Sequence, residues 1–321
     1  MQGVILAAGK GKRLQPVTPA RTKAMAPVAG KPIVARVLDL LVQNGIQEII
    51  LLISPDDPEI VPYFEQHPPP GVTFTFVVQH ERLGMAHALG LIAPHLRGDF
   101  VMSACDNLVP PEHIAALLEA HRTRQANATL SLMAIDIAYS ASTGIVEWQA
   151  DDTGFIRRIV EKPQPADAPS NVSSLPLYVF SARLLDYLSQ VKPSPRGEYE
   201  LQDAIQLLID HSGFVTGVLT PVRWQLTNVD DLLELNRHYL STEPVSAQIQ
   251  TTEIGVDTRI IPPVRIDAGS VIGNNCVIGP HVYLEANCVV ADGVHLTNAI
   301  ILRNSIIPRG TTVRDTVFRG A

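Results

Sequence analysis

Cysteine is scarce in this sequence, and long apolar runs are missing from it. Of the 321 residues only three are cysteines, Cys105, Cys276 and Cys288, and their spacing matches neither a disulfide framework nor a CxxC metal site. We therefore expect free thiols, which are usual in the cytosol. The longest apolar stretches, such as residues 49–53, are far shorter than the roughly 20 residues that span a bilayer. No basic region precedes the first apolar run, so we predict no signal peptide, a cytoplasmic location and no membrane partner.

Positive charge is in deficit as well. The chain has 25 lysines and arginines against 32 aspartates and glutamates, which gives a formal net charge of −7. A general surface for nucleic acid or for anionic lipid is therefore not expected, whereas local basic clusters could still bind small phosphates. Hydrophobic residues make up 46% and charged residues 18% of the chain, a composition typical of globular proteins. The chain is long enough to form two domains, each with a core of its own.

Short apolar runs alternate with amphipathic segments in the first three quarters of the chain. The pattern predicts strands at residues 3–8, 48–53, 73–78 and 99–104, and helices at residues 33–43, 86–95 and 111–124. Such alternation favours an α/β fold with a mostly parallel, Rossmann-like sheet covered on both faces. Sheets of this kind bind ligands at the carboxyl ends of their strands. We expect the functional site at that edge.

A different pattern begins at about residue 250. Aliphatic residues recur at every sixth position, at Ile254, Ile260, Ile266, Ile272, Ile278, Leu284, Val290, Leu296 and Leu302. Small or β-branched residues follow four positions later, at Ser270, Cys276, Val282, Cys288 and Val294. A period of six fits neither a helix nor a sheet meander, so it indicates a repeat architecture. These repeats resemble the hexapeptide-repeat family, which implies a short left-handed parallel β-helix of about three coils with Cys276 and Cys288 in its interior.

The change of pattern predicts two domains. The first comprises residues 1–240 and the second, the β-helix, residues 250–321, with a linker rich in Pro, Ser, Thr and Glu at residues 241–246.

A glycine-rich segment follows the first predicted strand. Leu6, Ala7 and Ala8 lead into Gly9 and Gly11, and glycines at such a turn let backbone N–H groups approach phosphate oxygens. Cationic side chains accompany the glycines, at Lys12, Arg13 and Lys23. The segment LAAGKGKRLQP with TKAMAPVAGKP resembles the signature of sugar-phosphate nucleotidyltransferases, the family that includes glucose-1-phosphate thymidylyltransferases and uridylyltransferases. The resemblance implies that residues 6–9 and 11–13 bind the nucleotide and that Arg13 and Lys23 are catalytic.

Further positions match motifs of the same family. The resemblance implies that Gln79 and Gly84 read the base and that Asp106 binds Mg²⁺. On the sugar side, it implies that Gly144 and Glu161 contact the sugar and that Lys162 holds the sugar phosphate as a catalytic cation.

Three positions depart from the family pattern. Lys12 stands where threonine or serine is usual, Pro176 replaces a glycine, and Leu226 stands in the common place of a second metal-binding aspartate. Asn228 is our candidate for that second metal ligand.

The resemblance implies transfer of a nucleoside monophosphate from a nucleoside triphosphate, with dTTP or UTP favoured, to a sugar 1-phosphate, with glucose 1-phosphate favoured. It implies Mg²⁺ as cofactor, small-molecule substrates and a homo-oligomer. Two alternatives remain open: a bifunctional enzyme that resembles N-acetylglucosamine-1-phosphate uridylyltransferase/acyltransferase, and a non-catalytic regulatory protein that binds a sugar nucleotide.

Overall fold

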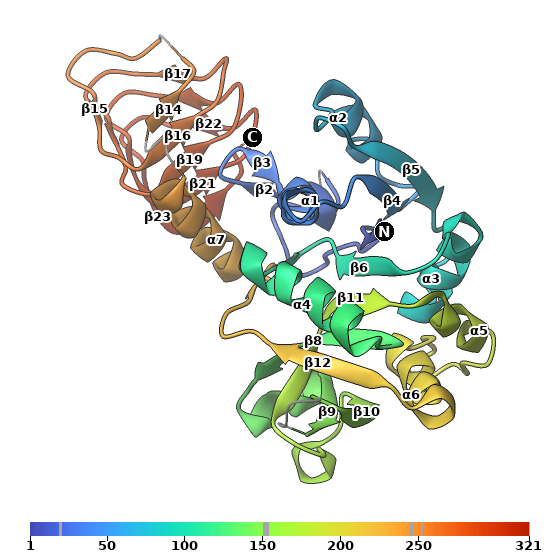
Figure 1. The fold of residues 1–321 in the computed structure, drawn as a ribbon. Coiled ribbons are helices and arrows are strands. Elements are labelled where there is room, and N and C mark those ends of the chain that lie inside the picture. Colours follow the sequence, from blue (N-terminus) through green and yellow to red (C-terminus); the bar gives the residue numbers. More distant parts are fainter. Residues whose placement is uncertain (19–20, 150–153, 244–246, 252, 321) are drawn as a thin grey trace. The chain divides into compact units, whose positions relative to one another are not determined.

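The computed structural model describes residues 1–321 except residues 19–20, 150–153, 244–246, 252 and 321. Part of the predicted linker, residues 244–246, thus lies outside the described residues. The chain divides into two compact units, and each unit is discontinuous in sequence (Figure 1). The first unit comprises residues 1–9 and 34–224, and the second comprises residues 10–33 and 225–321. The predicted domain boundaries at residues 240 and 250 stay a prediction.

The first unit is built on a mixed nine-stranded sheet. Seven strands lie side by side in the order β10 (Ile156–Glu161), β9 (Gly144–Trp148), β11 (Val172–Phe180), β6 (Phe100–Ala104), β1 (Gln2–Leu6), β4 (Glu48–Ile53) and β5 (Thr73–Val78). The remaining two are β8 (Ala128–Ala134), which pairs with β11, and β12 (Val215–Leu219), which pairs with β8. Strands β6, β1, β4 and β5 run parallel to one another. The predicted α/β class is confirmed.

Helices and short turns connect these strands. The helices are α1 (Ile33–Gln43), α2 (Ile60–Gln66), α3 (Met85–Ile92), α4 (Pro111–Arg124), α5 (Leu185–Leu188) and α6 (Leu201–Ser212). Shorter elements are β7 (Asn107–Leu108) and the 3₁₀ turns at Ala93–His95, Ile137–Ser142, Pro165–Asp167 and Ala182–Leu184. The core of this unit lies between the sheet and helices α3 and α6, and its largest fully buried side chains include Tyr178, Phe100 and Phe180.

The sequence pattern placed most of these elements well. Strands β4 and β5 and helices α1 and α4 have the predicted bounds. The helix predicted at residues 86–95 is α3 followed by a 3₁₀ turn, since Pro94 cannot donate the backbone hydrogen bond that would continue an α-helix. Proline also explains an irregularity in β11, whose register shifts between Leu175 and Tyr178 around Pro176. A proline inside a sheet is tolerated at such a bulge because it has no N–H to donate to the ladder.

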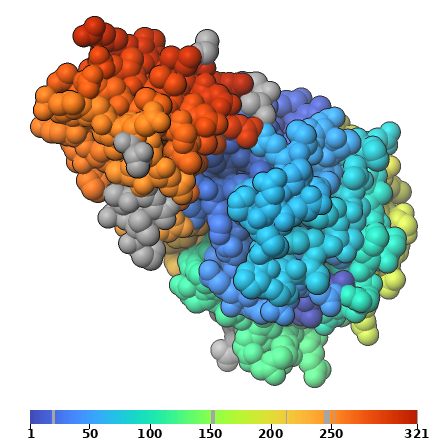
Figure 2. Space-filling view, turned by 90° about the horizontal axis from the view of Figure 1, so that it is seen from above, coloured from blue at the N-terminus to red at the C-terminus, as the bar shows by residue number. Residues whose placement is uncertain are grey.

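Residues 247–318 of the second unit form a parallel β-helix. Its strands are β14 (Ala247–Ile249), β15 (Arg259–Ile260), β16 (Val264–Ile266), β17 (Val271–Ile272), β18 (Val277–Ile278), β19 (Val282–Leu284), β20 (Val289–Val290), β21 (His295–Ile301), β22 (Ile306–Ile307) and β23 (Thr312–Phe318). The recorded ladders between these strands are parallel. In the space-filling view its orange and red residues form a solid lobe (Figure 2). The predicted β-helix is confirmed.

The six-residue period sets the interior of the β-helix. Ile260 pairs with Ile278, and Ile278 pairs with Leu296, so every third hexad stacks on the one before it. Other pairs depart from this spacing of 18 residues, among them Ile249 with Ile266 and Leu284 with Ile301, each 17 residues apart. The prediction of Leu302 as the ninth interior position is therefore wrong by one residue, because the coil that ends at Ile301 is one residue shorter than the coil directly before it. Ile301 packs in the core instead.

The predicted roles of the two β-helix cysteines are confirmed. Cys276 and Cys288 are fully buried in the β-helix core, and both are free thiols. Burial raises the pKa of the Cys288 thiol to about 11, which keeps it protonated at neutral pH.

The second unit also contains residues 10–33, which we call the loop segment. It includes a 3₁₀ turn at Lys23–Met25 and a hairpin of β2 (Pro27–Val28) and β3 (Lys31–Pro32). Strand β13 (Trp224–Gln225) lies where the first unit ends, and helix α7 (Val229–Thr242) precedes the β-helix. In the part of the chain that the structure describes, no helix is both long and apolar enough to cross a membrane.

Candidate active site

Four parallel strands bring the predicted residues of the first unit to one edge of the sheet. Strand β1 ends at Leu6, and Ala7 continues the pairing by donating its N–H to the Leu52 carbonyl at 2.7 Å. Gln79 follows β5 and donates its N–H to the Ile53 carbonyl at 2.9 Å. Cys105, next to Asp106, follows β6 and donates to the Leu6 carbonyl at 3.1 Å. Residues 6–9, Gln79 and Asp106 therefore share the carboxyl edge, where parallel α/β sheets bind ligands.

Arg82 supports the segment after β1, and sequence reasoning did not single it out. Its Nε donates to the Ala8 carbonyl at 2.7 Å, and its guanidinium also contacts Ser54 and Asp56, which follow β4. Gly9, the next residue after Ala8, is exposed, and no described atom lies within 4 Å of where its Cβ would be. The backbone at Gly9 is thus fixed from one side and open on the other, which suits the approach of a ligand.

Gln79 and Gly84 occupy defined positions near this edge. Gln79 is buried, and its Nε2 lies 3.3 Å from Nδ1 of His87 on α3. Gly84 has a φ of 107°, and a Cβ there would lie 2.5 Å from the Tyr199 carbonyl oxygen. Packing alone therefore requires glycine at position 84. Roles of Gln79 and Gly84 in reading the base remain predictions.

Asp106 is the predicted magnesium ligand of the first unit. It is half-buried and lies two residues beyond β6. Among the described residues no group of three or more His, Cys, Asp and Glu side chains could hold a metal on its own. Mg²⁺ is usually held by one or two carboxylates together with substrate phosphates and water, so a single strand-end aspartate fits this ion.

Two unpartnered acceptors mark the predicted sugar side. Glu161 lies opposite Gly144 in the β9–β10 ladder, and a Cβ at Gly144 would lie 3.2 Å from Glu161 Oε2 and 3.3 Å from Gln202 Cγ. Glu161 Oε2 and Gln202 Oε1 are both buried without a hydrogen-bond partner among the described residues. Buried acceptors without a partner are costly, so these two favour a ligand that brings hydrogen-bond donors. The structure thus brings Gly144 and Glu161 together and adds Gln202, which was not among the predicted site residues.

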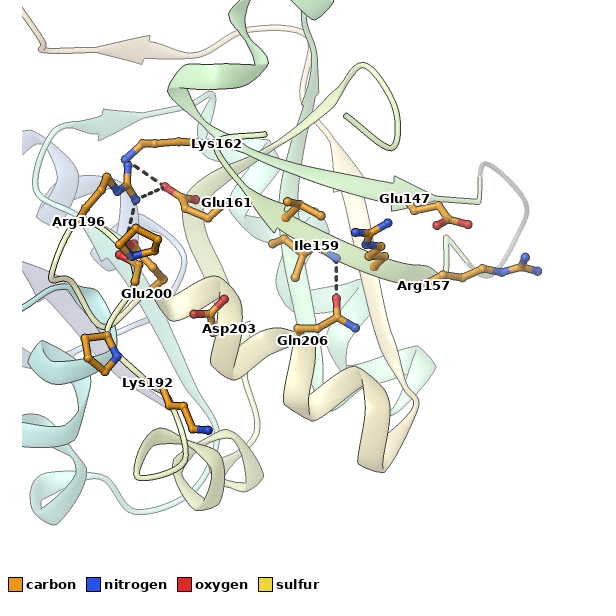
Figure 3. A pocket seen from close by; sticks show the side chains of 15 residues that line it. Glu147, Arg157, Ile159, Glu161, Lys162, Lys192, Arg196, Glu200, Asp203 and Gln206 are labelled. Atoms are coloured by element: carbon orange, nitrogen blue, oxygen red, sulfur yellow. Dashed lines mark hydrogen bonds and ion pairs between the residues drawn. The ribbon is translucent and has the colours of Figure 1, made fainter. Parts of the chain in front are cut away.

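Cations surround the Glu161 carboxylate on its other side. Oε1 of Glu161 lies 3.1 Å from Lys162 Nζ and 3.5 Å from Arg196 Nη2 (Figure 3). Arg196 also contacts Glu200 Oε1 at 2.7 Å, and this hydrogen bond raises the pKa of the Arg196 guanidinium. The two cations are partly exposed, at 35% for Lys162 and 41% for Arg196, whereas the carboxylates of Glu161 and Glu200 are only 12% and 6% exposed. Lys162 and Arg196 are therefore accessible to a phosphate while they remain next to these carboxylates.

Glu161 and the charged residues around it line a pocket of about 860 Å³ in the first unit, whereas Gly144 and Gln202 are not among its lining residues. Glu161, Lys162, Arg196 and Glu200 gather at one end of it, and Arg157 lies at the other (Figure 3). Burial, with the Glu200 charge adding to it, raises the pKa of Asp203 on the same wall. The pocket falls in the size range of small-molecule sites, and its lining carries charges of both signs.

The remaining predicted nucleotide ligands belong to the second unit. Lys12 and Arg13 are exposed, and Lys23 is half-buried. Gly11 has a φ of 64°, and a Cβ there would lie 2.8 Å from Lys23 Cβ, so Gly11 and Lys23 pack directly against each other. The N–H of Leu14 donates to the Gly11 carbonyl at 2.9 Å, as does the Thr18 hydroxyl at 3.1 Å. The loop segment thus presents its cations from a backbone that is folded on itself.

Asn228 has a clear structural role in the second unit. Its Oδ1 accepts the Asp231 N–H at 3.0 Å, and Asp231 accepts the Asn228 N–H in return, a capping box at the start of α7. Leu226, in the usual place of an aspartate, is fully buried. A metal-binding role for Asn228 remains a prediction, and the cap explains the residue without one.

Comparison with known proteins decides the family. The model of the nucleotidyl transferase family matches residues 2–242. The chain belongs to this family. A second model, the GMPPB C-terminal domain, matches residues 260–319, within the β-helix.

Two relatives specify the chemistry of the family. UTP–glucose-1-phosphate uridylyltransferase AglF of Haloferax volcanii is 32% identical over 70% of this chain and 90% of its own length. Glucose-1-phosphate thymidylyltransferase of Streptomyces griseus is 31% identical over 96% of this chain and 88% of its own length. This chain is therefore a sugar-1-phosphate nucleotidyltransferase, with a nucleoside triphosphate and a sugar 1-phosphate as substrates. Members of this family typically depend on Mg²⁺.

A solved structure supports the fold. The crystal structure of a UDP-glucose pyrophosphorylase in complex with UDP-glucose superposes with a TM-score of 0.69 at 19% identity, over 75% of this chain and 99% of that one.

Sequence signals existed for some of the missed residues. Residues 197–203 resemble the loop-to-helix segment near the family's sugar site. Arg196 directly precedes this segment, and Gln202 lies within it. Arg82 carried no such signal, because its partners Ala8 and Ser54 are distant in sequence.

Proposed function

We propose that the enzyme transfers a uridylyl or thymidylyl group from UTP or dTTP to glucose 1-phosphate. The two relatives described above are named for glucose 1-phosphate and for the transfer of a uridylyl or a thymidylyl group. Gln79 supports the choice, because a buried side-chain amide has both a donor and an acceptor for the edge of a base.

The observation that carries the sugar side of this proposal is the pair of unpartnered acceptors, Glu161 Oε2 and Gln202 Oε1. Hydroxyl groups of a hexose would donate to both atoms and remove the cost of burying them. Lys162 and Arg196, at the same end of the pocket, would then hold the phosphate group of the sugar.

The proposed reaction is a direct displacement. A phosphate oxygen of the sugar 1-phosphate attacks the α-phosphorus of the nucleotide, a new P–O bond forms, and the bond to the β-phosphate breaks as pyrophosphate leaves with the electron pair. Lys162 aims the attacking phosphate, while Arg13 and Lys23 hold the triphosphate charge. Asp106 would hold Mg²⁺, which would neutralise charge that develops on the phosphate oxygens, and Asn228 stays a predicted second ligand.

The alternatives are weighed differently after the comparisons. Membership in the nucleotidyltransferase family disfavours the non-catalytic regulatory protein. A second, acyl-transferring activity of the β-helix stays an alternative. Homo-oligomerisation and a cytoplasmic location stay predictions.

A matrix of substrates tests the proposal. Purified enzyme with Mg²⁺ is offered each of five nucleotides (UTP, dTTP, ATP, CTP and GTP) against glucose, galactose, mannose and N-acetylglucosamine 1-phosphates, and pyrophosphate release is measured. We expect the highest kcat/KM for glucose 1-phosphate with UTP or dTTP. A purine nucleotide or another sugar as the best substrate would contradict the proposed specificity.

A further inference from the structure

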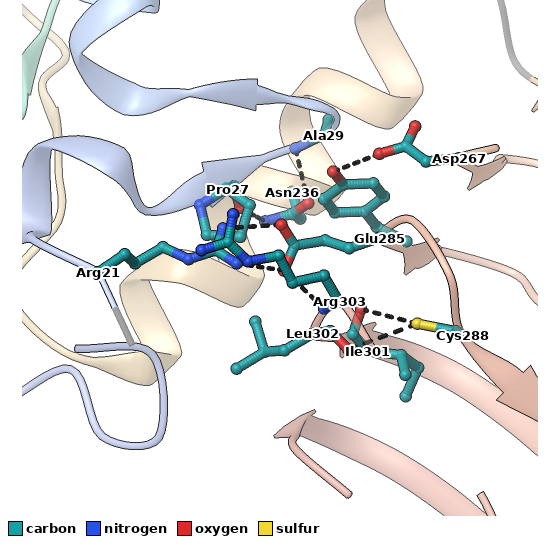
Figure 4. A network of polar contacts seen from close by, with 11 residues as sticks. Arg21, Pro27, Ala29, Asn236, Asp267, Glu285, Cys288, Ile301, Leu302 and Arg303 are labelled. Atoms are coloured by element: carbon teal, nitrogen blue, oxygen red, sulfur yellow. Dashed lines mark hydrogen bonds and ion pairs between the residues drawn. The ribbon is translucent and has the colours of Figure 1, made fainter. Parts of the chain in front are cut away.

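The loop segment and the β-helix are joined by a buried ion pair within the second unit. Arg21 Nη1 lies 2.7 Å from Glu285 Oε1, and Arg21 Nη2 lies 3.1 Å from Glu285 Oε2 (Figure 4). The two side chains are only 5% and 8% exposed. This two-point contact between a guanidinium and a carboxylate fixes both distance and orientation, which a single point charge does not.

The β-helix holds the Glu285 carboxylate rigidly. Glu285 donates its N–H to the Ile301 carbonyl at 2.9 Å, a bond between neighbouring coils. Its Oε2 also accepts the Arg303 N–H at 3.0 Å. The carboxylate is therefore held by contacts with the neighbouring coil, and Arg21 is attached to it.

A second attachment lies further along the loop segment. Asn236, on α7 and 2% exposed, accepts the Ala29 N–H at 2.8 Å and donates to the Pro27 carbonyl at 3.3 Å (Figure 4). Gly30 in the same hairpin leaves room for the Arg265 guanidinium, since a Cβ there would lie 1.9 Å from Arg265 Cζ. The loop segment is thus held on both sides of Lys23, at Arg21 and at residues 27–30.

We propose that Glu285 is a positioning residue for nucleotide binding, acting through Arg21 on Lys23 and Gly11. Lys23 is two residues from Arg21, and Gly11 packs on Lys23 Cβ. A shift of Arg21 would therefore move a predicted triphosphate cation and the glycine turn together. This inference depends on the proposed nucleotide role of the loop segment.

Stability alone does not account well for this pair. Burying two charges costs several kcal/mol of desolvation, and a hydrophobic pair of similar size often gives an equally or more stable protein. A bidentate ion pair instead specifies one geometry, and misplacing a catalytic group by about 1 Å can cost about 100-fold in rate.

The test compares single and double variants of the full-length enzyme. Glu285→Gln leaves Arg21 as a buried unpaired charge and is expected to lower stability. The double variant Arg21→Met/Glu285→Gln removes both charges, and the amide oxygen introduced at position 285 could still accept the Arg303 N–H. Arg21→Lys keeps the charge but loses the two-point contact. We expect each folded variant to show a nucleotide KM raised about tenfold or more, with the KM for sugar 1-phosphate unchanged within about twofold.

Two controls separate the possible failures. Ile307→Ala removes buried volume from the β-helix core and is expected to lower the melting temperature without changing the nucleotide KM. Lys23→Ala tests the underlying function: an unchanged nucleotide KM in this variant would contradict the proposed role of the loop segment. If Lys23→Ala raises the nucleotide KM but Arg21→Lys or the double variant, whichever folds, does not, the positioning role of Glu285 is overturned. A raised nucleotide KM in Ile307→Ala would also overturn it, because loss of stability alone would then suffice.

Discussion

The two units hold their charged side chains in opposite ways. In the first unit, Glu161, Lys162 and Arg196 form partly exposed ion pairs at one end of a pocket. In the second unit, Arg21 and Glu285 form an ion pair that is almost completely buried. Water screens the first set and makes it weak and easily rearranged, whereas the second set is desolvated and sensitive to geometry.

The difference distinguishes side chains that bind a substrate from side chains that fix the backbone in place. The partly exposed cations of the first set are accessible to a substrate phosphate, so the pocket suits binding and release of a ligand. A buried pair cannot lose one partner without leaving an uncompensated charge, so it suits a fixed attachment of backbone. Mutations in the first set should therefore change kinetics, and mutations in the second set should change stability or geometry.

The largest effect is expected at the carboxyl edge of the sheet. Asp106→Asn removes the carboxylate that the first unit offers to Mg²⁺, and we expect kcat to fall about 100- to 1,000-fold with little change in melting temperature. Asp99→Asn, directly before the same strand, is the matched control and should retain activity. Near wild-type turnover of Asp106→Asn at ordinary Mg²⁺ concentration would show that the metal assignment is wrong.

The next effect concerns the exposed ion pairs. Lys162→Ala should lower kcat/KM for the sugar 1-phosphate about 100-fold, because a phosphate partner is lost, while the free energy of unfolding changes by about 0.5 kcal/mol or less. Arg157→Ala, at the other end of the pocket, should have a much smaller effect on kinetics. Equal effects of the two variants would remove Lys162 from the phosphate site.

Mutation of the buried attachment between the loop segment and α7 should change stability. Asn236→Ala removes the buried hydrogen bonds that the side chain makes to the Ala29 N–H and the Pro27 carbonyl inside the second unit, and we expect the free energy of unfolding to fall by about 2 kcal/mol. The side-chain amide of Asn44 donates a similar hydrogen bond to the carbonyl four residues before it, but Asn44 is only half-buried. Urea titrations should show a loss of about 0.5 kcal/mol for Asn44→Ala. A loss for Asn236→Ala that does not exceed this control would contradict the attachment.

The smallest expected effect is on the pH dependence of stability, and it comes from a side chain that is buried in its neutral form. His113 on α4 is buried against Ser131, with 2.8 Å between Nε2 and Oγ, and burial lowers its pKa from 6.5 to about 4. Between pH 6.5 and 4 the unfolded chain therefore binds more protons than the folded one. The contribution of neutral His113 to the free energy of unfolding is complete above pH 6.5 and is lost as the pH falls toward 4.

Between pH 7 and pH 5 the expected loss from His113 is about 1.5 kcal/mol. His113→Gln should remove this part of the pH dependence, measured as the difference between urea unfolding free energies at the two pH values. His95→Gln, at an exposed position, should leave it unchanged. A pH dependence that is the same in His113→Gln and wild type would show that His113 does not titrate as proposed.

Local patterns predicted many elements of the fold. The bounds of β4, β5, α1 and α4 followed from apolar periodicity, and the period of six predicted the interior of the β-helix from Ile260 to Leu296, whereas Ile254 at its start is exposed. The prediction failed at Leu302, because the coil there is one residue shorter and Ile301 takes the interior position. The sequence does not reveal this shift, since both Ile301 and Leu302 are aliphatic. Only the pairing between coils distinguishes them.

The sequence alone determined the family, the reaction class and the motifs that line the carboxyl edge of the sheet, because these depend on residues that are close together in the chain. The tertiary structure decided which distant residues meet. It brought Gln202 to Gly144 and Glu161, Arg82 to Ala8, and Glu285 to Arg21. It also joined residues 10–33 to the β-helix unit rather than to the sheet that precedes and follows them in sequence. Contacts of this kind depend on packing and desolvation between separate segments, and no local periodicity records them.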